Sequence, residues 1–449
     1  MAVRQKYDVI DLEKGTLDNN IFTSGEVYQD EMERVFGRAW LMISHESLIP
    51  NPNDFFLSYM GEDPVIVTRD SKGQVHTFLN MCRHRGNRIV RADDGNAKNV
   101  MCAYHGWTFS NQGELVSVPG LQEAYYGELD VENLGLVEAR VDVYAGMIFA
   151  TWSEDAPSLE AFLGDARWYL DTRFNYRDCG MQALGPMKWI EPVNWKTPVD
   201  NSSDNYHAQT THISVGLARR VVKDPSEGPA VAPRSPFDNT GKHLFVNGHS
   251  MTLRMLQNGV TRPFRGRTPE NASAYVNFHK QTLPEVERRL GKYRAHAFYV
   301  GNHTIFPNSV LELRMALPRG PQRTEFWSFA TYEKDAPDEI VRTQRTGHMG
   351  GIGISGLNEQ DDLDNWIQVS QSGLSPIRRR YRHQLSMGIG HNDPLSEHKG
   401  GMVSERFFSE SNQRNLYSRW QEFMNADSWK DIHIDPITAT FEGTATMKG

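Results

Sequence analysis

The chain has 449 residues, of which 39% are hydrophobic and 23% are charged, so it can form two or three domains with cores of their own and is not mainly disordered. Its net charge of -8 argues against a nucleic-acid scaffold with a basic face. It has no apolar run of membrane-helix length, no signal-peptide pattern and too few cysteines for a disulfide framework, so we expect a cytoplasmic protein with no nucleic-acid or membrane partner.

Residues 23–40 are predicted to form a helix, because Thr23 and Glu26 have the spacing of a capping box and apolar residues follow at helical intervals. From residue 41 to about 153 the sequence changes to short β-type runs separated by turn signals. The clearest of these runs are 64–68, 75–79 and 145–152. This pattern predicts a small all-β domain.

Beyond residue 153, helical and strand patterns occur in the same region. Helical periodicity marks residues 159–170, 283–293 and 412–424. Strand-like runs at 310–316 and 325–331 are joined through a Pro-Arg-Gly-Pro turn. The second half of the chain is therefore predicted to be an α+β domain with an antiparallel sheet.

Two of the three cysteines each lie beside a histidine, as Cys82-Arg-His84 and Cys102-Ala-Tyr-His105. Two thiolates and two imidazoles are the ligands of a Rieske [2Fe–2S] centre, in which two histidines replace two cysteines on one iron. A structural zinc ion uses the same ligand types, but zinc fingers usually pair cysteine with cysteine and histidine with histidine along the chain. The pattern favours the cluster and leaves zinc as the alternative.

A second candidate site combines His207 and His212 with a distant acidic cluster at 358–366, which contains Asp361 and Asp362. The histidines are five residues apart, about 500° around a regular helix, so an irregular turn is needed to bring both to one ion. Two histidines and one carboxylate form the facial triad of non-haem Fe(II) oxygenases, which leaves adjacent positions open. By spacing alone, ordinary hydrogen-bonded histidines are the commoner explanation.

The stretches 81–86 and 102–107 resemble the cluster motif of the Rieske oxygenases, in the form common among aromatic ring-hydroxylating members. Asp204-x-x-His207 followed by His212 is similar to the catalytic motif of that family. The resemblance covers nearly the whole chain and is closest to the large (alpha) subunits of the naphthalene and biphenyl dioxygenase group. It implies a helical segment packed on the catalytic domain, an all-β Rieske domain and a catalytic domain of helix-grip type, at 1–40, 41–153 and 154–449.

The resemblance also implies two iron centres in each chain. One [2Fe–2S] cluster would be held by Cys82, His84, Cys102 and His105. One mononuclear Fe(II) would be held by His207, His212 and Asp362, with Asp361 as the fallback carboxylate.

Asp204 would connect the two centres, by linking a cluster histidine of one subunit to an iron-ligand histidine of the next, so activity would require an oligomer.

A local shortening before His207 leaves open whether Asp200 or Asn201 stands near the iron. Gly347 and Asn358 stand where relatives often carry large rings, which implies a roomier pocket. The alternative is that Ile352, Ile354 or a shifted backbone fills that space.

The implied reaction is O₂-dependent hydroxylation, and most simply cis-dihydroxylation, of a hydrophobic polycyclic or substituted aromatic ring. Electrons would come from NADH through a flavin reductase and/or a ferredoxin, since no Gly-x-Gly-x-x-Gly follows a strand here to bind the nicotinamide. A small beta subunit would complete a hexamer of three alpha and three beta subunits. The alternatives are a Rieske monooxygenase or demethylase and, from another class, a non-catalytic electron carrier or zinc-organised module.

Overall fold

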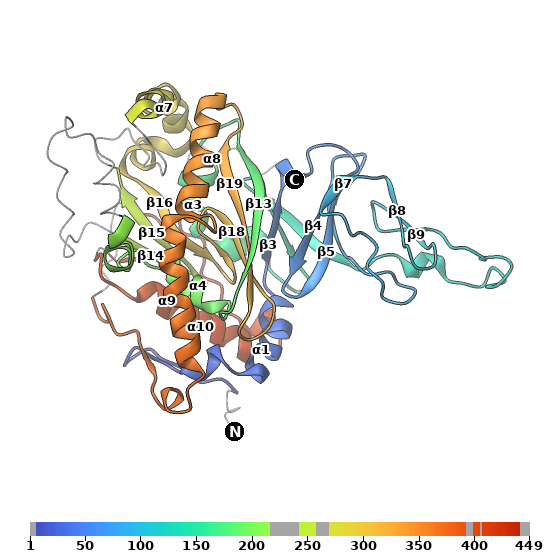
Figure 1. The fold of residues 1–449 in the computed structure, drawn as a ribbon, viewed down its shortest axis with the longest axis horizontal. Helices are drawn as coiled ribbons and strands as arrows, with labels where there is room; N and C mark the ends of the chain where they lie inside the picture. Colours follow the sequence, from blue (N-terminus) through green and yellow to red (C-terminus); the bar gives the residue numbers. More distant parts are fainter. Residues whose placement is uncertain (1–5, 216–241, 257–268, 392–397, 405, 441–449) are drawn as a thin grey trace. The chain divides into compact units, whose positions relative to one another are not determined.

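The computed structural model describes residues 6–215, 242–256, 269–391, 398–404 and 406–440. The chain divides into two compact units (Figure 1). One unit is Met32–Leu159, and the other combines Met1–Glu31 with Glu160–Gly449. These boundaries lie near the predicted domain boundaries, which stay predictions.

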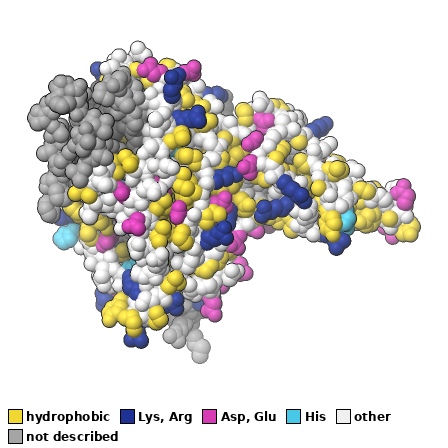
Figure 2. All heavy atoms as spheres, viewed as in Figure 1, with side chains coloured by type: hydrophobic (Ala, Val, Ile, Leu, Met, Phe, Trp, Pro, Cys, Tyr) yellow, Lys and Arg dark blue, Asp and Glu magenta, His cyan; other side chains and the backbone are white. Residues whose placement is uncertain are grey.

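Acidic and basic side chains are both present on the face drawn in Figure 2. None of the helices in the described ranges combines the length and the apolar character that crossing a membrane requires.

The unit at 32–159 is built on antiparallel β-sheets. Among its described residues, seven strands form one sheet in the order β3-β12-β11-β6-β5-β4-β7, and three form a second sheet in the order β10-β9-β8. The strand bounds are β3 (Leu41–His45), β4 (Asp54–Met60), β5 (Asp63–Arg69), β6 (Val75–Leu79), β7 (Asp94–Asn96), β8 (Asn99–Met101), β9 (Thr108–Ser110), β10 (Leu115–Ser117), β11 (Glu138–Tyr144) and β12 (Met147–Thr151). Phe78, Trp107 and Phe109 pack with both cysteines of this unit in one buried core. The predicted all-β domain is confirmed.

The predicted helix at 23–40 is only partly correct. Helix α1 covers Gly25–Glu31, a wider π-helical turn follows at Met32–Phe36, and strand β3 begins at Leu41. Ser24, not Thr23, caps the helix, because its hydroxyl accepts a hydrogen bond from the Val27 N–H.

The predicted strand at 145–152 begins later than expected, at Met147. Ala145 and Gly146 have φ values of 52° and 82°, so they form the turn from β11 instead of extending the strand.

The unit that contains residues 160–440 is an antiparallel sheet with helices packed on it (Figure 1). Its described strands follow the order β13-β19-β18-β17-β16-β15-β14-β21, and β1-β2-β20 form a small separate sheet. The strand bounds are β1 (Ile10–Asp11), β2 (Thr16–Leu17), β13 (Met181–Glu191), β14 (Lys242–Val246), β15 (His249–Met255), β16 (Phe298–Ile305), β17 (Ser309–Val310), β18 (Leu313–Pro318), β19 (Thr324–Glu333), β20 (His383–Gln384) and β21 (Met402–Ser404). The α+β prediction is confirmed.

The helices cover different parts of this sheet. Helix α8 packs on β19, α3 on β16, and α10 on β14 and β15. Trp366 of α9 stacks on Phe326 of β19, with ring centroids 5.8 Å apart. The helix bounds are α2 (Leu159–Leu163), α3 (Ala166–Phe174), α4 (Lys196–Asn201), α5 (Ala208–Thr211), α7 (Pro269–Ala297), α8 (Asp338–Ile352), α9 (Leu357–Gly373) and α10 (Ser411–Asn425).

Two elements predicted as continuous are interrupted. The helix at 159–170 is divided into α2 and α3 by Gly164, whose φ of 52° is not helical. The strand at 310–316 is divided into β17 and β18 by Leu311 and Glu312, whose φ values are 30° and 58°. Positive φ is uncommon outside glycine, so the residue types at positions 311 and 312 give no signal that the strand is interrupted there.

A buried carboxylate connects the N-terminal segment to the rest of this unit. Glu31, at the end of α1, is fully buried and accepts a hydrogen bond from Lys196 Nζ at 2.6 Å. The indole N–H groups of Trp195 and Trp420 also donate to this carboxylate, each at 2.8 Å. One carboxylate thus joins α1, the start of α4 and α10.

We predict that Glu31→Gln destabilises the protein by about 3–5 kcal/mol, because it leaves the buried ammonium of Lys196 without its counter-charge. Chemical denaturation followed by tryptophan fluorescence measures this change. The double variant Glu31→Gln, Lys196→Met removes the stranded charge and should recover part of the loss. Glu33→Gln, at an exposed neighbouring position, is the matched control and should change stability by less than about 0.5 kcal/mol. A Glu31→Gln variant as stable as this control would contradict the assignment.

Candidate functional site

Two loops with the same backbone hydrogen bonds carry the four Cys and His residues. In each loop the cysteine N–H donates to the carbonyl five residues later, at 2.8 Å, and the glycine four residues later donates back to the cysteine carbonyl. Gly86 and Gly106 have φ values of 74° and 76°, which glycine adopts without strain. The histidine is the third residue of the first loop and the fourth of the second. The two loops therefore have the same backbone conformation but carry their imidazole at different positions.

The two loops bring their side chains together. Cys82 and Cys102 are both buried. The rings of His84 and His105 have centroids 4.6 Å apart at an interplanar angle of 73°, and His84 stacks on Trp107. Nδ1 of His84 is buried and has no hydrogen-bond partner in the described part of the chain. Two thiols, two imidazoles and a buried ring nitrogen that lacks a partner fit the ligand set of a Rieske cluster.

Backbone N–H groups face both sulfur atoms. They come from residues 84 and 85 for Cys82 and from residues 104 and 105 for Cys102. Burial raises the pKa of the Cys82 thiol. Burial also acts to raise the pKa of Cys102, but the N–H of Tyr104 and the Asn87 amide outweigh it and lower that pKa. Donors of this kind stabilise the thiolate, the form in which cysteine binds a metal.

His207 and His212 flank one short helical turn, α5, in the other unit. His207 directly precedes the turn, and His212 ends it with φ -101° and ψ 26°. The two rings therefore approach each other, with centroids 5.5 Å apart at an interplanar angle of 76°. The irregular turn that the five-residue spacing requires is present.

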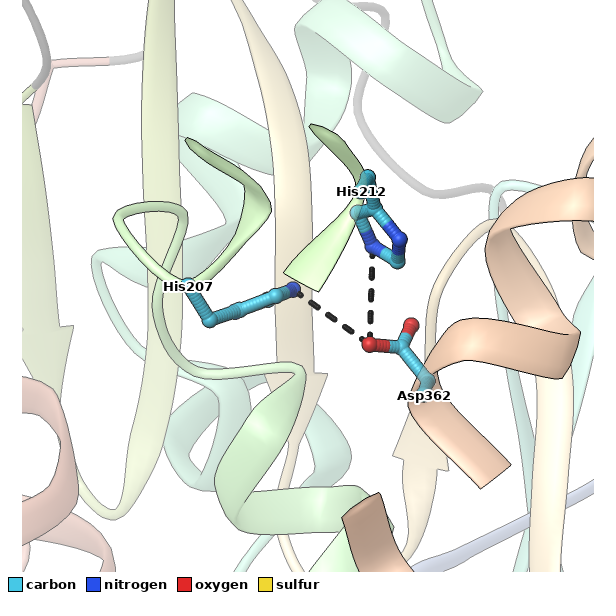
Figure 3. A group of neighbouring side chains, drawn as sticks. All are labelled: His207, His212 and Asp362. Carbon is cyan, nitrogen blue, oxygen red and sulfur yellow. Dashed lines mark ion pairs between the residues drawn. The ribbon is translucent and has the colours of Figure 1, made fainter. Parts of the chain in front are cut away.

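Each of these histidines has one carboxylate near Nδ1. The two histidines share another carboxylate, that of Asp362, near their Nε2 atoms (Figure 3). Nδ1 of His207 lies 2.7 Å from Asp204, and Nδ1 of His212 lies 3.4 Å from Asp361. Their Nε2 atoms lie 3.8 Å and 3.5 Å from the same oxygen, Oδ1 of Asp362. Histidines that bind metals commonly engage a carboxylate through the other ring nitrogen. The geometry thus places Asp362 at the centre and Asp361 behind His212.

Asp362, on α9, is 5% exposed, and its Oδ1 has no hydrogen-bond donor within the described ranges. Ligand atoms of His207, His212 and Asp362 all lie within 4.8 Å of one another. A buried carboxylate oxygen that faces two imidazole nitrogens and receives no hydrogen bond is best stabilised by a cation. The three side chains fit one ion of the type held by a 2-His-1-carboxylate triad.

Asp204 is held in place from three sides. The backbone N–H of His207 donates to Oδ1 at 3.2 Å, and the amide of Gln413 donates to Oδ2 at 3.1 Å. The Asn302 amide donates to the main-chain carbonyl of Asp204 at 2.9 Å. Burial acts to lower the pKa of His207, but its hydrogen bond to Asp204 outweighs this effect and raises that pKa. Asp204 therefore fixes the orientation of His207.

A cavity of about 420 Å³ lies beside the triad and is lined by all three of its residues. This volume is within the range of small-molecule sites. Many of the other lining side chains are polar or charged, unlike those of a typical ligand pocket. They include Arg173, Arg254, Glu312, Gln344, His348 and Asn205.

The interrupted strand carries a charged residue into this cavity, which the sequence did not predict. Glu312 pairs with Arg173 at 2.8 Å and with Nδ1 of His348 at 2.8 Å. The three residues are far apart in the sequence, and the backbone break that presents Glu312 has no glycine to signal it. No local pattern could have identified this group.

The four residues predicted near the substrate lie in different places. Asn201 and Asn358 line the cavity. Asp200 is not among its lining residues and accepts a hydrogen bond from the Tyr417 hydroxyl at 2.5 Å. Burial raises the pKa of Asp200 to about 7. Gly347 is buried on α8 beside the lining residue His348, and it is not itself among the lining residues.

Comparison with known families assigns each of the two units to a domain family. Residues 39–138 match the Rieske [2Fe-2S] domain, and residues 159–426 match the ring hydroxylating alpha subunit (catalytic domain). These matches decide between cluster and zinc, in favour of a [2Fe–2S] cluster and a mononuclear iron in each chain.

Relatives of similar length give the same assignment. The biphenyl 2,3-dioxygenase subunit alpha of Rhodococcus jostii is 36% identical over 433 residues, which cover 94% of this chain and 92% of the relative. The large oxygenase component of the naphthalene 1,2-dioxygenase system of Pseudomonas aeruginosa is 34% identical and covers 91% of each chain.

Solved structures agree with the sequence relatives. A naphthalene 1,2-dioxygenase variant bound to phenanthrene has a TM-score of 0.86 at 29% identity, covering 95% of this chain and 96% of its own. The naphthalene 1,2-dioxygenase of a Rhodococcus species, bound to indole, has a TM-score of 0.80 at 33% identity, covering 93% and 98%. The predicted resemblance is confirmed: this chain belongs to the alpha subunits of the Rieske non-haem iron ring-hydroxylating dioxygenases.

Proposed function

We propose that this chain catalyses the O₂-dependent cis-dihydroxylation of an aromatic ring. The observation that carries the proposal is the convergence of His207, His212 and Asp362 on a cavity of ligand size. The Rieske domain supports it, because it gives the same chain an electron carrier.

The reaction adds both atoms of O₂ to the ring together with two electrons and two protons. NADH supplies the two electrons and one proton as it is oxidised to NAD⁺, and solvent supplies the second proton. The bound iron centres supply the oxygen and one-electron chemistry. His207, His212 and Asp362 would hold the iron, and all three residues line the cavity in which the ring would bind. Asn201 and Asn358 line the space in which the ring is oriented.

Asp204 is proposed as the positioning residue between the two iron centres. One oxygen of its carboxylate contacts His207, and Gln413 holds the other. We further propose that His105 of a neighbouring subunit approaches Asp204, so that the cluster of one chain serves the iron of the next. The four cluster ligands are proposed to be Cys82, His84, Cys102 and His105.

The alternatives receive less support. A non-catalytic electron carrier has no need of a second metal site, and the triad would be unexplained. The biphenyl and naphthalene dioxygenase relatives favour dioxygenation over the monooxygenase or demethylase alternative. The roomier pocket inferred from Gly347 stays a prediction.

The relatives are large components of multi-component oxygenase systems, and such a component requires partner subunits and electron carriers. For this chain we propose a small beta subunit in a hexamer of three alpha and three beta subunits, with a flavin reductase and/or a ferredoxin as electron donor. When the chain is expressed with its neighbouring genes, a second, smaller chain should copurify in equal amount. Purification of the active alpha chain alone would contradict this proposal.

We predict that His207→Ala loses the mononuclear iron and the dioxygenase activity but keeps the cluster. Iron analysis of anaerobically purified protein should fall from about three to about two atoms per chain, with the Rieske EPR signal unchanged. His433→Ala, at an exposed histidine, is the control and should keep all the iron. Loss of the Rieske signal in His207→Ala, or zinc in place of iron in the wild type, would contradict the proposed function.

We predict that Asp204→Asn keeps both iron centres but slows electron transfer between them by at least about tenfold, because the amide no longer holds His207 as a charged acceptor does. Stopped-flow oxidation of the reduced cluster measures the rate. Asp364→Asn, an exposed acid of α9, should leave that rate unchanged. Equal rates in the two variants would exclude the role of Asp204.

The same variant tests the exchange between subunits. A chain with Asp204→Asn keeps its cluster, and a chain with His105→Ala keeps its Asp204. If electrons pass between neighbouring subunits, coexpression of these two impaired chains should give more activity than either chain alone. Transfer within one chain would give no such gain.

A further inference from the structure

Two arginines line the cavity beside the triad, and their surroundings differ. Arg173 is neutralised by Glu312, at 2.8 Å. Arg254, on β15, makes one hydrogen bond within the described ranges, from Nη2 to the amide oxygen of Asn205 at 3.0 Å. No carboxylate of the described residues forms an ion pair with Arg254, and none of these residues supplies an acceptor to its buried Nε. Among the described residues, no carboxylate therefore compensates the charge of Arg254 at the cavity wall.

A guanidinium whose buried Nε has no acceptor among the described residues is costly unless something else supplies one. Arg254 packs so closely over Gly301 of β16 that a Cβ at that glycine would lie 2.7 Å from Nε. The Asn205 amide holds the other end of the guanidinium. The group is thus fixed in position and pre-organised for an acceptor in the cavity.

We infer that the cavity binds an aromatic substrate that carries a carboxylate, and that Arg254 is the group that recognises it. This inference rests on the proposed function and names the substrate class of the same site. A guanidinium presents its N–H groups as a planar fork that matches a carboxylate, and the paired charges strengthen these hydrogen bonds. A neutral hydrocarbon would leave the donors of Arg254 unsatisfied.

The position of Arg254 also directs the ring. Its anchor, Asn205, is two residues before His207, so the carboxylate would be bound close to the triad. The aromatic ring of the bound acid then extends into the rest of the cavity, whose total volume is about 420 Å³. Polar lining residues such as Gln344 tolerate a charged substrate better than an apolar wall would.

The test compares three two-ring probes with the holoenzyme and its electron-transfer partners. The probes are naphthalene, 2-naphthoate and 2-naphthamide, of which the last is a neutral near-isostere of the acid. For the wild type we expect a higher kcat/KM for 2-naphthoate than for 2-naphthamide. In Arg254→Met this ratio should fall by about tenfold or more, mainly through KM, because a charge-assisted pair is lost. Calorimetric titration of 2-naphthoate into the enzyme should show the same loss of affinity without turnover.

Two variants control the comparison. Arg254→Lys keeps the charge and loses the fork, so its ratio should fall between those of the wild type and Arg254→Met. Arg345→Met removes an exposed arginine from α8 and should leave the ratio unchanged. The Rieske spectrum and the iron content report whether each variant is folded. If Arg254→Met does not fold, the wild-type preference for the acid and its weakening at high salt decide the question.

A ratio that is unchanged in Arg254→Met, or a wild type that binds 2-naphthoate no better than 2-naphthamide, would overturn the inference. In either case, oxidation of naphthalene would leave the proposed function standing. If none of the three probes is oxidised while 2-naphthoate still binds through Arg254, the proposed function fails and the binding site remains.

Discussion

The buried carboxylate of Glu31 is the constraint on which the catalytic unit depends. It accepts hydrogen bonds from Lys196, Trp195 and Trp420, which lie at the start of α4 and on α10. Burying a carboxylate is unfavourable unless its partners are held in place, so this cluster fixes the entry to α4. Asp200 and Asn201 end that helix, and Asp204 and His207 follow it. The same helix α10 that donates to Glu31 supplies Gln413 to Asp204. Helix α10 thus helps to hold the iron-binding segment both at its start, through Trp420 and Glu31, and at Asp204, through Gln413.

Acidic residues perform two tasks at the triad. A carboxylate beside Nδ1 fixes the orientation of each imidazole, and a single shared oxygen of Asp362 faces both Nε2 atoms. Two of these carboxylates, Asp361 and Asp362, are consecutive in α9. Neighbouring positions on a helix point in different directions, so one residue contacts the back of His212 and the next reaches the front of both rings. This arrangement gives Asp361 a role beside the triad although it is not one of the three proposed ligands.

The parts of the site that the sequence could predict are those encoded by short motifs. Cys82, His84, Cys102 and His105 stand close together in two loops, and the residue types alone suggest their chemistry. The choice of Asp362 required the family resemblance, because carboxylates are common at helix starts. The Arg173–Glu312–His348 group and Arg254 were missed, because each depends on contacts between strands and helices that are distant in the sequence.

The fold likewise contains elements that the local sequence predicts and elements that depend on tertiary contacts. Strands β5, β6 and β19 were predicted from their β-branched and aromatic runs, with ends near those observed. Helix α10 was predicted from its apolar periodicity. The errors lie where backbone conformation overrides composition, as in the π-helical turn after α1 and the positive φ of Leu311 and Glu312. Tertiary contacts select such conformations, and local propensity does not report them.

The break between β17 and β18 limits how far this enzyme can be made more thermostable. Two consecutive residues with positive φ, neither of them glycine, cost on the order of 1–3 kcal/mol each. Glycine at position 312 would relieve part of that strain. The same change would remove the counter-charge of Arg173 and the hydrogen-bond partner of His348 inside the cavity. The protein therefore sacrifices stability at this point to keep a carboxylate there, and gains in robustness are better sought away from this bend.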